Sequence, residues 1–311
     1  MKILWDIISL LLLFIVLGIS ADFIVMNVKR IASTLKIKLF TLGILLGVIT
    51  TLPELSVGIN ATMEKAAAIS VGNILGGVII LLCLILGISL TLNGKTSTDG
   101  KIKTILPQTA ILLSPILLGI DGTYSLIDGI IMIGLYAGFI FYVHKKHQED
   151  KPENTKKPET KKIIKASFII LVGVVFLLLS SGMIVDTTLD LLSKTNISKL
   201  FIGMIVFSIG TNLPEITITI TSWFKKTGEL SLSHLLSSAV TNIFVLGILS
   251  TISPIVFNNT TSFITVSVFI VIALGCFVNF YKSDKKMDRK EGLLLLSIYI
   301  LFLIVNIFWS H

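Results

Sequence analysis

Charged residues are scarce in this 311-residue chain: only 14% of the residues are Asp, Glu, Lys or Arg, while 53% are hydrophobic. Together with a mean hydropathy of +0.94, this composition is typical of a membrane protein with several spans. Cysteine is also rare. Cys83 and Cys276 fall inside apolar stretches with no second cysteine nearby, so we expect two small buried hydrophobic residues rather than a metal site.

Motifs of enzymes and of nucleic-acid-binding proteins are missing as well. The sequence contains no His-Glu-x-x-His, no Gly-x-Ser-x-Gly and no Gly-rich phosphate loop, the motifs that usually mark such catalysis. The net charge is +8, but the basic residues form no stripe interleaved with aromatic residues, so a nucleic-acid partner is not expected. We therefore expect that the protein is not an enzyme and binds no cofactor. We expect the lipid bilayer to be one of its partners.

Ten apolar stretches follow one another along the chain, each near the roughly 20 residues that a helix needs to cross a bilayer. They predict an all-α membrane protein with ten transmembrane helices, at residues 4–26, 37–62, 67–92, 103–120, 124–143, 163–191, 199–223, 230–253, 262–281 and 291–309. The first stretch ends near Gly18-Ile19-Ser20, which resembles a signal-peptide cleavage site. It is long for a signal peptide, and we interpret it as the first span.

Basic residues fall mostly into alternate connections between these spans. If the N-terminus lies outside, every Lys and Arg except Lys2, Lys65, Lys194 and Lys199 lies on the inner side. The positive-inside rule then predicts that both termini are extracellular, in a multi-pass protein of the cell membrane. The short connections favour a prokaryotic plasma membrane.

A segment rich in Lys, Glu and Pro, residues 144–162, separates the spans into two groups of five. We predict a first repeat at 1–143, a cytoplasmic linker at 144–162 and a second repeat at 163–311. Because five is odd, the second repeat enters the bilayer from the opposite face. Inverted repeats of this kind are common in secondary transporters, whose binding sites lie where the repeats meet near the bilayer midplane.

Both halves carry a shared motif at one fixed offset. Lys38-Leu39-Phe40 and Leu52-Pro53-Glu54 recur 161 residues later as Lys199-Leu200-Phe201 and Leu213-Pro214-Glu215. A carboxylate in the middle of an apolar span costs roughly 3 kcal/mol on insertion scales. Two such carboxylates at equivalent positions predict that Glu54 and Glu215 hold a cation or a proton inside the membrane.

Hydroxyl groups accompany both glutamates. Thr50 precedes Glu54 by four residues and Thr211 precedes Glu215 by four, so each pair shares one face of a helix. Hydroxyl and carboxylate oxygens are ligands that Na⁺ and Ca²⁺ prefer. Small hydroxylated residues also let helices pack closely in membranes, and the sequence leaves both interpretations of the threonines open.

Prolines add backbone oxygens to the predicted site. Pro53 and Pro214 have no backbone N–H to donate. The carbonyl groups four residues earlier, those of Ile49 and Gly210, therefore lose their helical hydrogen-bond partners. In hydrocarbon such a carbonyl must find a partner in the protein or face a cavity. A bound cation is one such partner, which makes Ile49 and Gly210 candidate ligands.

The spans that follow the two motifs carry further polar residues. Ser238 and Asn242 are four residues apart and offer a hydroxyl and an amide oxygen to one ion. For Asn73 we favour a hydrogen bond between helices over a role as a ligand. Histidine side chains titrate near neutral pH, so His234 is a candidate for a proton relay. A structural role is the alternative.

At these residues the sequence resembles the cation/Ca²⁺ exchanger superfamily, in particular the compact prokaryotic Na⁺/Ca²⁺ exchangers. Their repeats carry Gly-Thr-Ser-Leu-Pro-Glu followed by Gly-Asn-x-x-Gly-Ser-Asn-x-x-Asn or Asp. The resemblance implies alternating access around a central site for Na⁺ and Ca²⁺. It adds Thr51 to the ligand-bearing positions. It also implies three departures: Asn212 and Gly77 replace serines of the family, and Leu81 replaces an asparagine.

We therefore expect a secondary active antiporter that exchanges Ca²⁺ for Na⁺, with inorganic cations as its transported partners. The two departures at Gly77 and Leu81 remove side-chain ligands, so the resemblance does not extend to an exchange of three Na⁺ for one Ca²⁺. Two alternatives stay open. One is a proton-coupled cation exchanger, and the other is a degenerate membrane homologue that does not transport.

Overall fold

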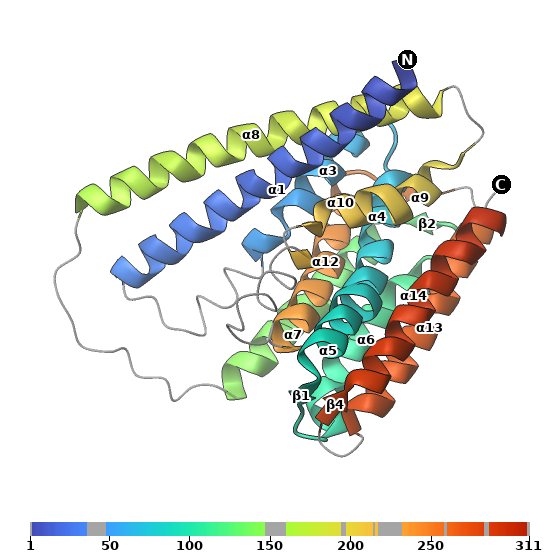
Figure 1. Cartoon of the computed structure of the whole chain (residues 1–311). Coiled ribbons are helices and arrows are strands. Elements are labelled where there is room, and N and C mark those ends of the chain that lie inside the picture. The colour runs from blue at the N-terminus through green and yellow to red at the C-terminus, as the bar shows by residue number, and fades with distance from the viewer. Residues whose placement is uncertain are drawn as a thin grey trace.

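A computed structural model describes residues 2–35, 48–146, 160–193, 197–213, 215–216, 232–257, 260–282 and 286–309. These residues are mostly helical and form one bundle, with two long helices running side by side along one edge (Figure 1). The α-helices are α1 (Lys2–Leu35), α3 (Leu52–Met63), α4 (Ala68–Ile79), α5 (Leu86–Asn93), α6 (Ile102–Leu118), α7 (Leu126–Lys146), α8 (Thr160–Leu192), α9 (Lys199–Ile202), α10 (Ser208–Thr211), α12 (Leu232–Ile252), α13 (Thr260–Lys282) and α14 (Arg289–Trp309).

Two helices contain a stretch of wider π-helical turns. The segment η1 (Ile80–Ile85) joins α4 to α5, and η2 (Gly203–Phe207) joins α9 to α10. The structure thus contains two continuous helices, α4–η1–α5 and α9–η2–α10. Seven described helices are long and apolar enough to cross a membrane. The predicted spans at 37–62 and 199–223, and the predicted linker at 144–162, lie partly outside the described residues.

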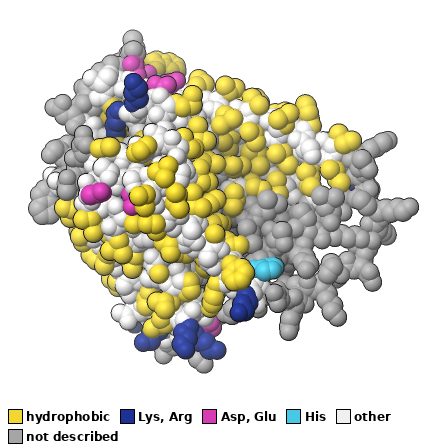
Figure 2. Space-filling model, turned by 180° about the vertical axis from the view of Figure 1, so that it is seen from behind, with side chains coloured by type: hydrophobic (Ala, Val, Ile, Leu, Met, Phe, Trp, Pro, Cys, Tyr) yellow, Lys and Arg dark blue, Asp and Glu magenta, His cyan; other side chains and the backbone are white. Residues whose placement is uncertain are grey.

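Apolar side chains cover the outside of the bundle as well as its core. Large hydrophobic residues such as Trp5, Phe141, Phe168 and Phe308 are exposed, while α4 and η1 are buried over most of their length. Figure 2 shows apolar side chains over much of the visible face and charged ones at its left edge and at the bottom. Because helices that are apolar all round belong in a core or in lipid, the chain is an integral membrane protein.

Two short strand pairs connect the two halves of the chain. Strand β1 (Lys95–Ser97) pairs with β4 (Lys286–Asp288), and β2 (Thr123–Tyr124) pairs with β3 (Ile255–Val256), both antiparallel. In each pair a turn from the first half meets a turn from the second. The strands were not predicted, because two or three residues give no periodic pattern.

The centre of the bundle depends on a close approach between α4 and η2. A Cβ atom on Gly203 would lie 2.9 Å from the backbone nitrogen of Asn73 and 3.0 Å from the Cα of Gly72. Atoms at such distances overlap, so glycine is required here for the two backbones to touch. The crossing places Asn73 of α4 next to Thr211 of α10.

The long helices α1 and α8 pack against each other (Figure 1), and they contact the rest of the bundle mainly through α3 and α10. The hydroxyl groups of Ser56 and Ser181 lie 2.5 Å apart, and the Asn60 amide donates to the Ser181 hydroxyl at 2.9 Å. Ser56 and Ser181 are buried. This polar contact therefore fixes the position of α8 along α3.

Candidate cation site

The backbone takes the same form just before each of the two glutamates. Thr51 ends the helical turn at residues 48–50 with φ −95° and ψ 10°, and Asn212 follows α10 with φ −93° and ψ 10°. Beyond them, the N–H of Leu55 donates to the Thr51 carbonyl at 3.0 Å, and that of Ile216 to the Asn212 carbonyl at 3.1 Å. Because the paired residues are 161 positions apart, the two halves share one local geometry.

Proline explains the interruption in the first half. Pro53 lies in the first turn of α3, where its missing N–H costs no hydrogen bond. The same lack means that Pro53 cannot donate to the carbonyl of half-buried Ile49. Pro214 lies outside the described residues, so the carbonyl of buried Gly210 as a ligand stays a prediction; Gly210 itself packs against the ring of Phe14.

The two glutamates lie near each other in the interior of the protein. Glu54 is 4% exposed and Glu215 is 7% exposed, and their carboxyl groups are close enough to repel each other electrostatically. The Oε2 atom of Glu54 is buried and accepts no hydrogen bond from the described residues. Since burying a charged oxygen without a partner is costly, the arrangement is well suited to a cation between the carboxylates.

Thr211 connects one glutamate to the helix crossing. Its hydroxyl donates to the Oδ1 atom of Asn73 at 3.0 Å and lies within hydrogen-bonding reach of the Glu54 carboxyl. A hydroxyl has one hydrogen to donate, so it can serve Asn73 or Glu54 but not both. The contact bears out the prediction that Asn73 hydrogen-bonds between helices.

A gap at Gly77 brings two amide side chains together. A Cβ atom on Gly77 would lie 3.4 Å from the Nδ2 atoms of both Asn212 and Asn242. The Nδ2 atom of Asn212 donates to the Ser208 carbonyl at 2.9 Å. The Oδ1 atom of Asn242 is buried and accepts no hydrogen bond from the described part of the chain, so it is available to a cation.

The remaining predicted residues surround this centre less closely. Thr51 and Ser238 are buried, while Thr50 is half-buried. The Thr51 hydroxyl donates to the carbonyl of Val48 at 2.9 Å. The side chain of His234 lies outside the described residues. Leu81 is buried in the apolar core, so no polar atom replaces the asparagine that the resemblance implies at this position.

Asp22 is a charged neighbour that the sequence interpretation missed. It lies on α1 with an exposed side chain and interacts electrostatically with Glu215 and with Lys29. A carboxylate in the middle of an apolar stretch was the signal that identified Glu54, and it applies equally to Asp22.

The ligand set consists of few charged groups. Within the described ranges, no group of three or more His, Cys, Asp and Glu side chains could hold a metal ion. The predicted ligands are two carboxylates together with hydroxyl, amide and backbone oxygens. Such oxygens suit Na⁺ and Ca²⁺ rather than transition metals, which favour nitrogen and sulfur.

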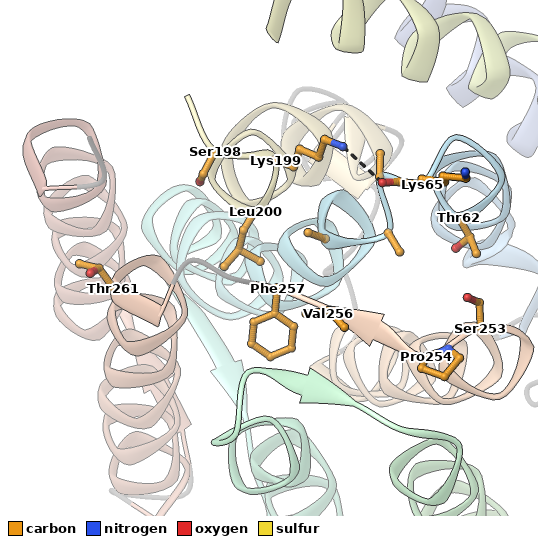
Figure 3. A pocket seen from close by; sticks show the side chains of 13 residues that line it. Thr62, Lys65, Ser198, Lys199, Leu200, Ser253, Pro254, Val256, Phe257 and Thr261 are labelled. Carbon is orange, nitrogen blue, oxygen red and sulfur yellow. Dashed lines mark hydrogen bonds between the residues drawn. The ribbon is translucent and has the colours of Figure 1, made fainter. Parts of the chain in front are cut away.

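A separate cavity of about 910 Å³ lies at the ends of α3 and α12 and the start of α9 (Figure 3). Its lining includes Lys65, Lys199 and Ser198 but none of the predicted cation ligands. The Lys199 ammonium donates to the Lys65 carbonyl at 3.3 Å. Lys65 adopts a left-handed backbone, φ 54°, at the end of α3, so this contact neutralises a helix C-terminus.

Known proteins resemble this chain in sequence. The chain is 24% identical to the uncharacterized membrane protein MJ0091 of Methanocaldococcus jannaschii over 199 residues. This match covers 64% of this chain and 64% of that protein. It is 26% identical over 139 residues to the sodium/calcium exchanger MaX1 of Methanosarcina acetivorans, covering 44% of this chain and 39% of that protein. The matches thus span less than two thirds of these relatives.

Solved structures resemble the chain over nearly its full length. The sodium-calcium exchanger NCX_Mj matches with a TM-score of 0.66 and 24% identity over 96% of this chain and 97% of that one. The H⁺/Ca²⁺ exchanger CAX matches with a TM-score of 0.75 and 16% identity over 97% and 82%. These likenesses establish the fold, which is that of membrane exchangers.

The family described as "Sodium/calcium exchanger protein" matches residues 5–145 and 165–308. The two matched segments contain both Leu-Pro-Glu motifs and omit the region between the two halves. Both the backbone geometry before the glutamates and the fold agree with this match. The chain therefore belongs to the sodium/calcium exchanger protein family.

Proposed function

We propose that this protein is a secondary active antiporter that exchanges Ca²⁺ for Na⁺ across the cell membrane. The observation that carries the proposal is the burial of two carboxyl groups, Glu54 and Glu215, at equivalent positions in the two halves and close enough to interact electrostatically. The names of its relatives and structural neighbours supply the ion pair. The proposed ligands are Glu54 and Glu215 with oxygens of Thr50, Thr51, Thr211, Ile49, Gly210, Ser238, Asn242 and Asn212.

Electrostatics gives the mechanism. Two carboxylates brought together in a low-dielectric interior repel each other and lose their hydration. A bound cation offsets both costs, so the loaded site can face either side of the membrane with little penalty. The empty site cannot change sides as readily, and this difference couples the movement of one ion to that of the other.

We further propose the architecture that suits this mechanism. Residues 1–143 and 163–311 form two inverted five-helix repeats joined by a cytoplasmic linker at 144–162, with both termini outside. The matching backbone at Thr51 and Asn212 and the reciprocal strand pairs support two related halves. Labelling of a single cysteine placed at either terminus with a membrane-impermeant reagent tests the orientation; protection of both ends in intact cells would contradict it.

The central test removes each carboxylate in turn. Glu54→Gln and Glu215→Gln keep the shape of the side chains and remove the charge, so we expect ⁴⁵Ca²⁺ uptake driven by a Na⁺ gradient in proteoliposomes to be lost. Glu64→Gln is the matched control, because Glu64 is exposed at the end of the same helix as Glu54. Full uptake in both site variants would refute the proposal.

A second candidate is coupling to protons instead of Na⁺. Buried carboxyl groups bind protons as well as metal ions, and the neighbour with the same fold that is named an H⁺/Ca²⁺ exchanger gives this option a specific precedent. Comparing Ca²⁺ uptake driven by a pH gradient with uptake driven by a Na⁺ gradient separates the two. Absence of flux under either gradient would instead favour a homologue that does not transport.

A further inference from the structure

Basic side chains gather at the end of the bundle where β1 and β4 pair. These strands bring together the connections that follow α5 and α13. Figure 2 shows Lys and Arg side chains at the bottom of the molecule, the end at which Figure 1 draws the two strands. Six exposed residues of the strands and of the helix starts after them form what we call the basic surface: Lys95, Lys101, Lys103, Lys286, Arg289 and Lys290.

The acidic residues of this region bind the backbone at the start of the two helices. Asp99 accepts hydrogen bonds from the Lys101 N–H at 2.8 Å and from the Thr104 hydroxyl at 2.6 Å. Asp288 and Glu291 each accept a hydrogen bond from the backbone N–H of the other, at 3.2 and 2.8 Å, which is a capping arrangement. Six basic and three acidic side chains leave these nine residues with a net charge of +3.

Three of the basic residues stand where a helix disfavours them. Arg289 and Lys290 are the first two residues of α14, and Lys103 is the second residue of α6. The N-terminus of a helix carries a partial positive charge, which destabilises basic side chains beside it. A bound anion would reverse this effect, because the basic side chains and the helix end would then attract the same group.

Exposed leucines lie one helical turn further along from these basic side chains. Leu293 and Leu294 follow Arg289 and Lys290 by four residues each, and 50% and 47% of their surface is exposed. Such pairs share one face of a helix. Leu106, which is 57% exposed, stands one turn after the basic residue of α6. An apolar surface below a basic one suits an amphiphile with an anionic head better than it suits a free anion.

We propose that the basic surface binds the headgroups of anionic phospholipids, with their acyl chains along the exposed leucines of α6 and α14. The negative headgroups offset the net charge of the surface and the positive ends of both helices. This inference goes beyond the proposed antiport, because it concerns a choice among the lipids of the bilayer and not the transported ions.

Titration of the full-length protein in a neutral detergent, followed by native mass spectrometry, tests the lipid preference. A basic residue beside an anionic headgroup strengthens binding about fivefold. A headgroup on Arg289 and Lys290 should therefore make dioleoyl phosphatidylglycerol bind about 25-fold more tightly than zwitterionic dioleoyl phosphatidylcholine. The preference should shrink when NaCl is raised from about 0.1 to about 1 M, since the Debye length falls from about 10 to about 3 Å.

Two results of this titration would overturn the proposal. Equal affinity for the two lipids would show that the surface does not select the anionic headgroup. Displacement of bound phosphatidylglycerol by inorganic phosphate at millimolar concentration would assign the surface to a soluble anion. Phosphatidylglycerol binding that phosphate does not displace supports a lipid.

Paired substitutions locate the binding. Arg289→Gln with Lys290→Gln should lower the affinity for phosphatidylglycerol about 25-fold. The control, Lys65→Gln with Lys199→Gln, removes the same charge from exposed residues and should keep the affinity, because Lys65 precedes α4 whereas β1 follows α5, at the other end of one continuous helix. An equal loss in both double variants would show that overall charge attracts the lipid, and would overturn the assignment to this surface.

Melting temperatures separate lost binding from lost folding. In detergent without added lipid, the Arg289→Gln and Lys290→Gln double variant should melt at the same temperature as the unmodified protein or higher, because the repulsion at the start of α14 is gone. A lower melting temperature would contradict the electrostatic argument on which the proposal rests.

Discussion

The close crossing of α4 and η2 predicts a large effect from a single added methyl group. In a Gly203→Ala variant the new Cβ atom would lie 2.9 Å from the Asn73 nitrogen and 3.0 Å from the Gly72 Cα, and it would also overlap the Ile69 carbonyl. Carbon contacts need about 3.5 Å or more. Backbone atoms cannot rotate away as a side chain can, so the two helices must separate.

The size of the effect follows from two opposing contributions. Overpacking costs up to about 3 kcal/mol, and replacing glycine by alanine inside a helix returns about 1 kcal/mol. The net loss of about 2 kcal/mol corresponds to a fall in melting temperature of about 4–8 °C for domains of about 150–250 residues, and to a smaller fall in this longer chain. Because the crossing aligns Asn73 with Thr211, we also expect slower Ca²⁺ exchange.

Thermal unfolding of the purified protein in detergent measures this effect. The matched control is Gly134→Ala on α7, where a Cβ atom would meet nothing within 4 Å. Its melting temperature should stay the same or rise slightly, because only the helix-forming contribution remains. A Gly203→Ala variant as stable as the unmodified protein would refute the argument that the two backbones touch.

Two further variants test contacts away from the crossing. Ser181→Ala removes the hydroxyl that hydrogen-bonds with Ser56 and Asn60, and thermal unfolding should show a loss of about 1–3 kcal/mol in stability. The control is Ser297→Ala, which removes an exposed hydroxyl bonded to its own helix and should leave stability unchanged. Equal melting temperatures for the two variants would contradict the buried contact. Hydrogen bonds from the Thr104 hydroxyl and the Lys101 amide hold the pKa of Asp99 below its usual range. Asp99 therefore adds stability above the usual pKa of about 4, and this stability is lost as the pH falls through the lowered pKa. Asp99→Asn should lower the melting temperature slightly at pH 7 and hardly at all at pH 2. An equal fall in melting temperature at both pH values would contradict a stabilising role of the ionised Asp99 carboxylate.

The helices were accessible from sequence because lipid imposes a simple rule on length and hydrophobicity. The predicted span at 291–309 agrees with α14 at Arg289–Trp309, and the predicted span at 262–281 agrees with α13 at Thr260–Lys282. The proximity of Glu54 and Glu215, which interact electrostatically, was also predictable, since duplication of a motif is expected to place both copies where the two halves meet. The ten-helix count stays a prediction.

Other features depend on contacts that no local pattern contains. The convergence of Asn212 and Asn242 on Gly77 brings together α4, α12 and the turn after α10, and from the sequence Gly77 was only a lost ligand. Likewise, the pairing of Ser56 with Ser181 joins residues of both halves. Such contacts follow from how the helices cross, which hydrophobicity alone does not specify.

The strand pairs across the two halves bear on how the protein is synthesised. Strand β1 leaves the ribosome roughly 190 residues before its partner β4, which at about 5–20 residues per second amounts to about 10–40 s. During that interval the turn after α5 has no strand to pair with, and β2 likewise waits for β3. The turn after α5 thus stays unpaired until β4 has been made, just before the last helix, α14, whereas β2 can pair earlier, once β3 has been made before α13.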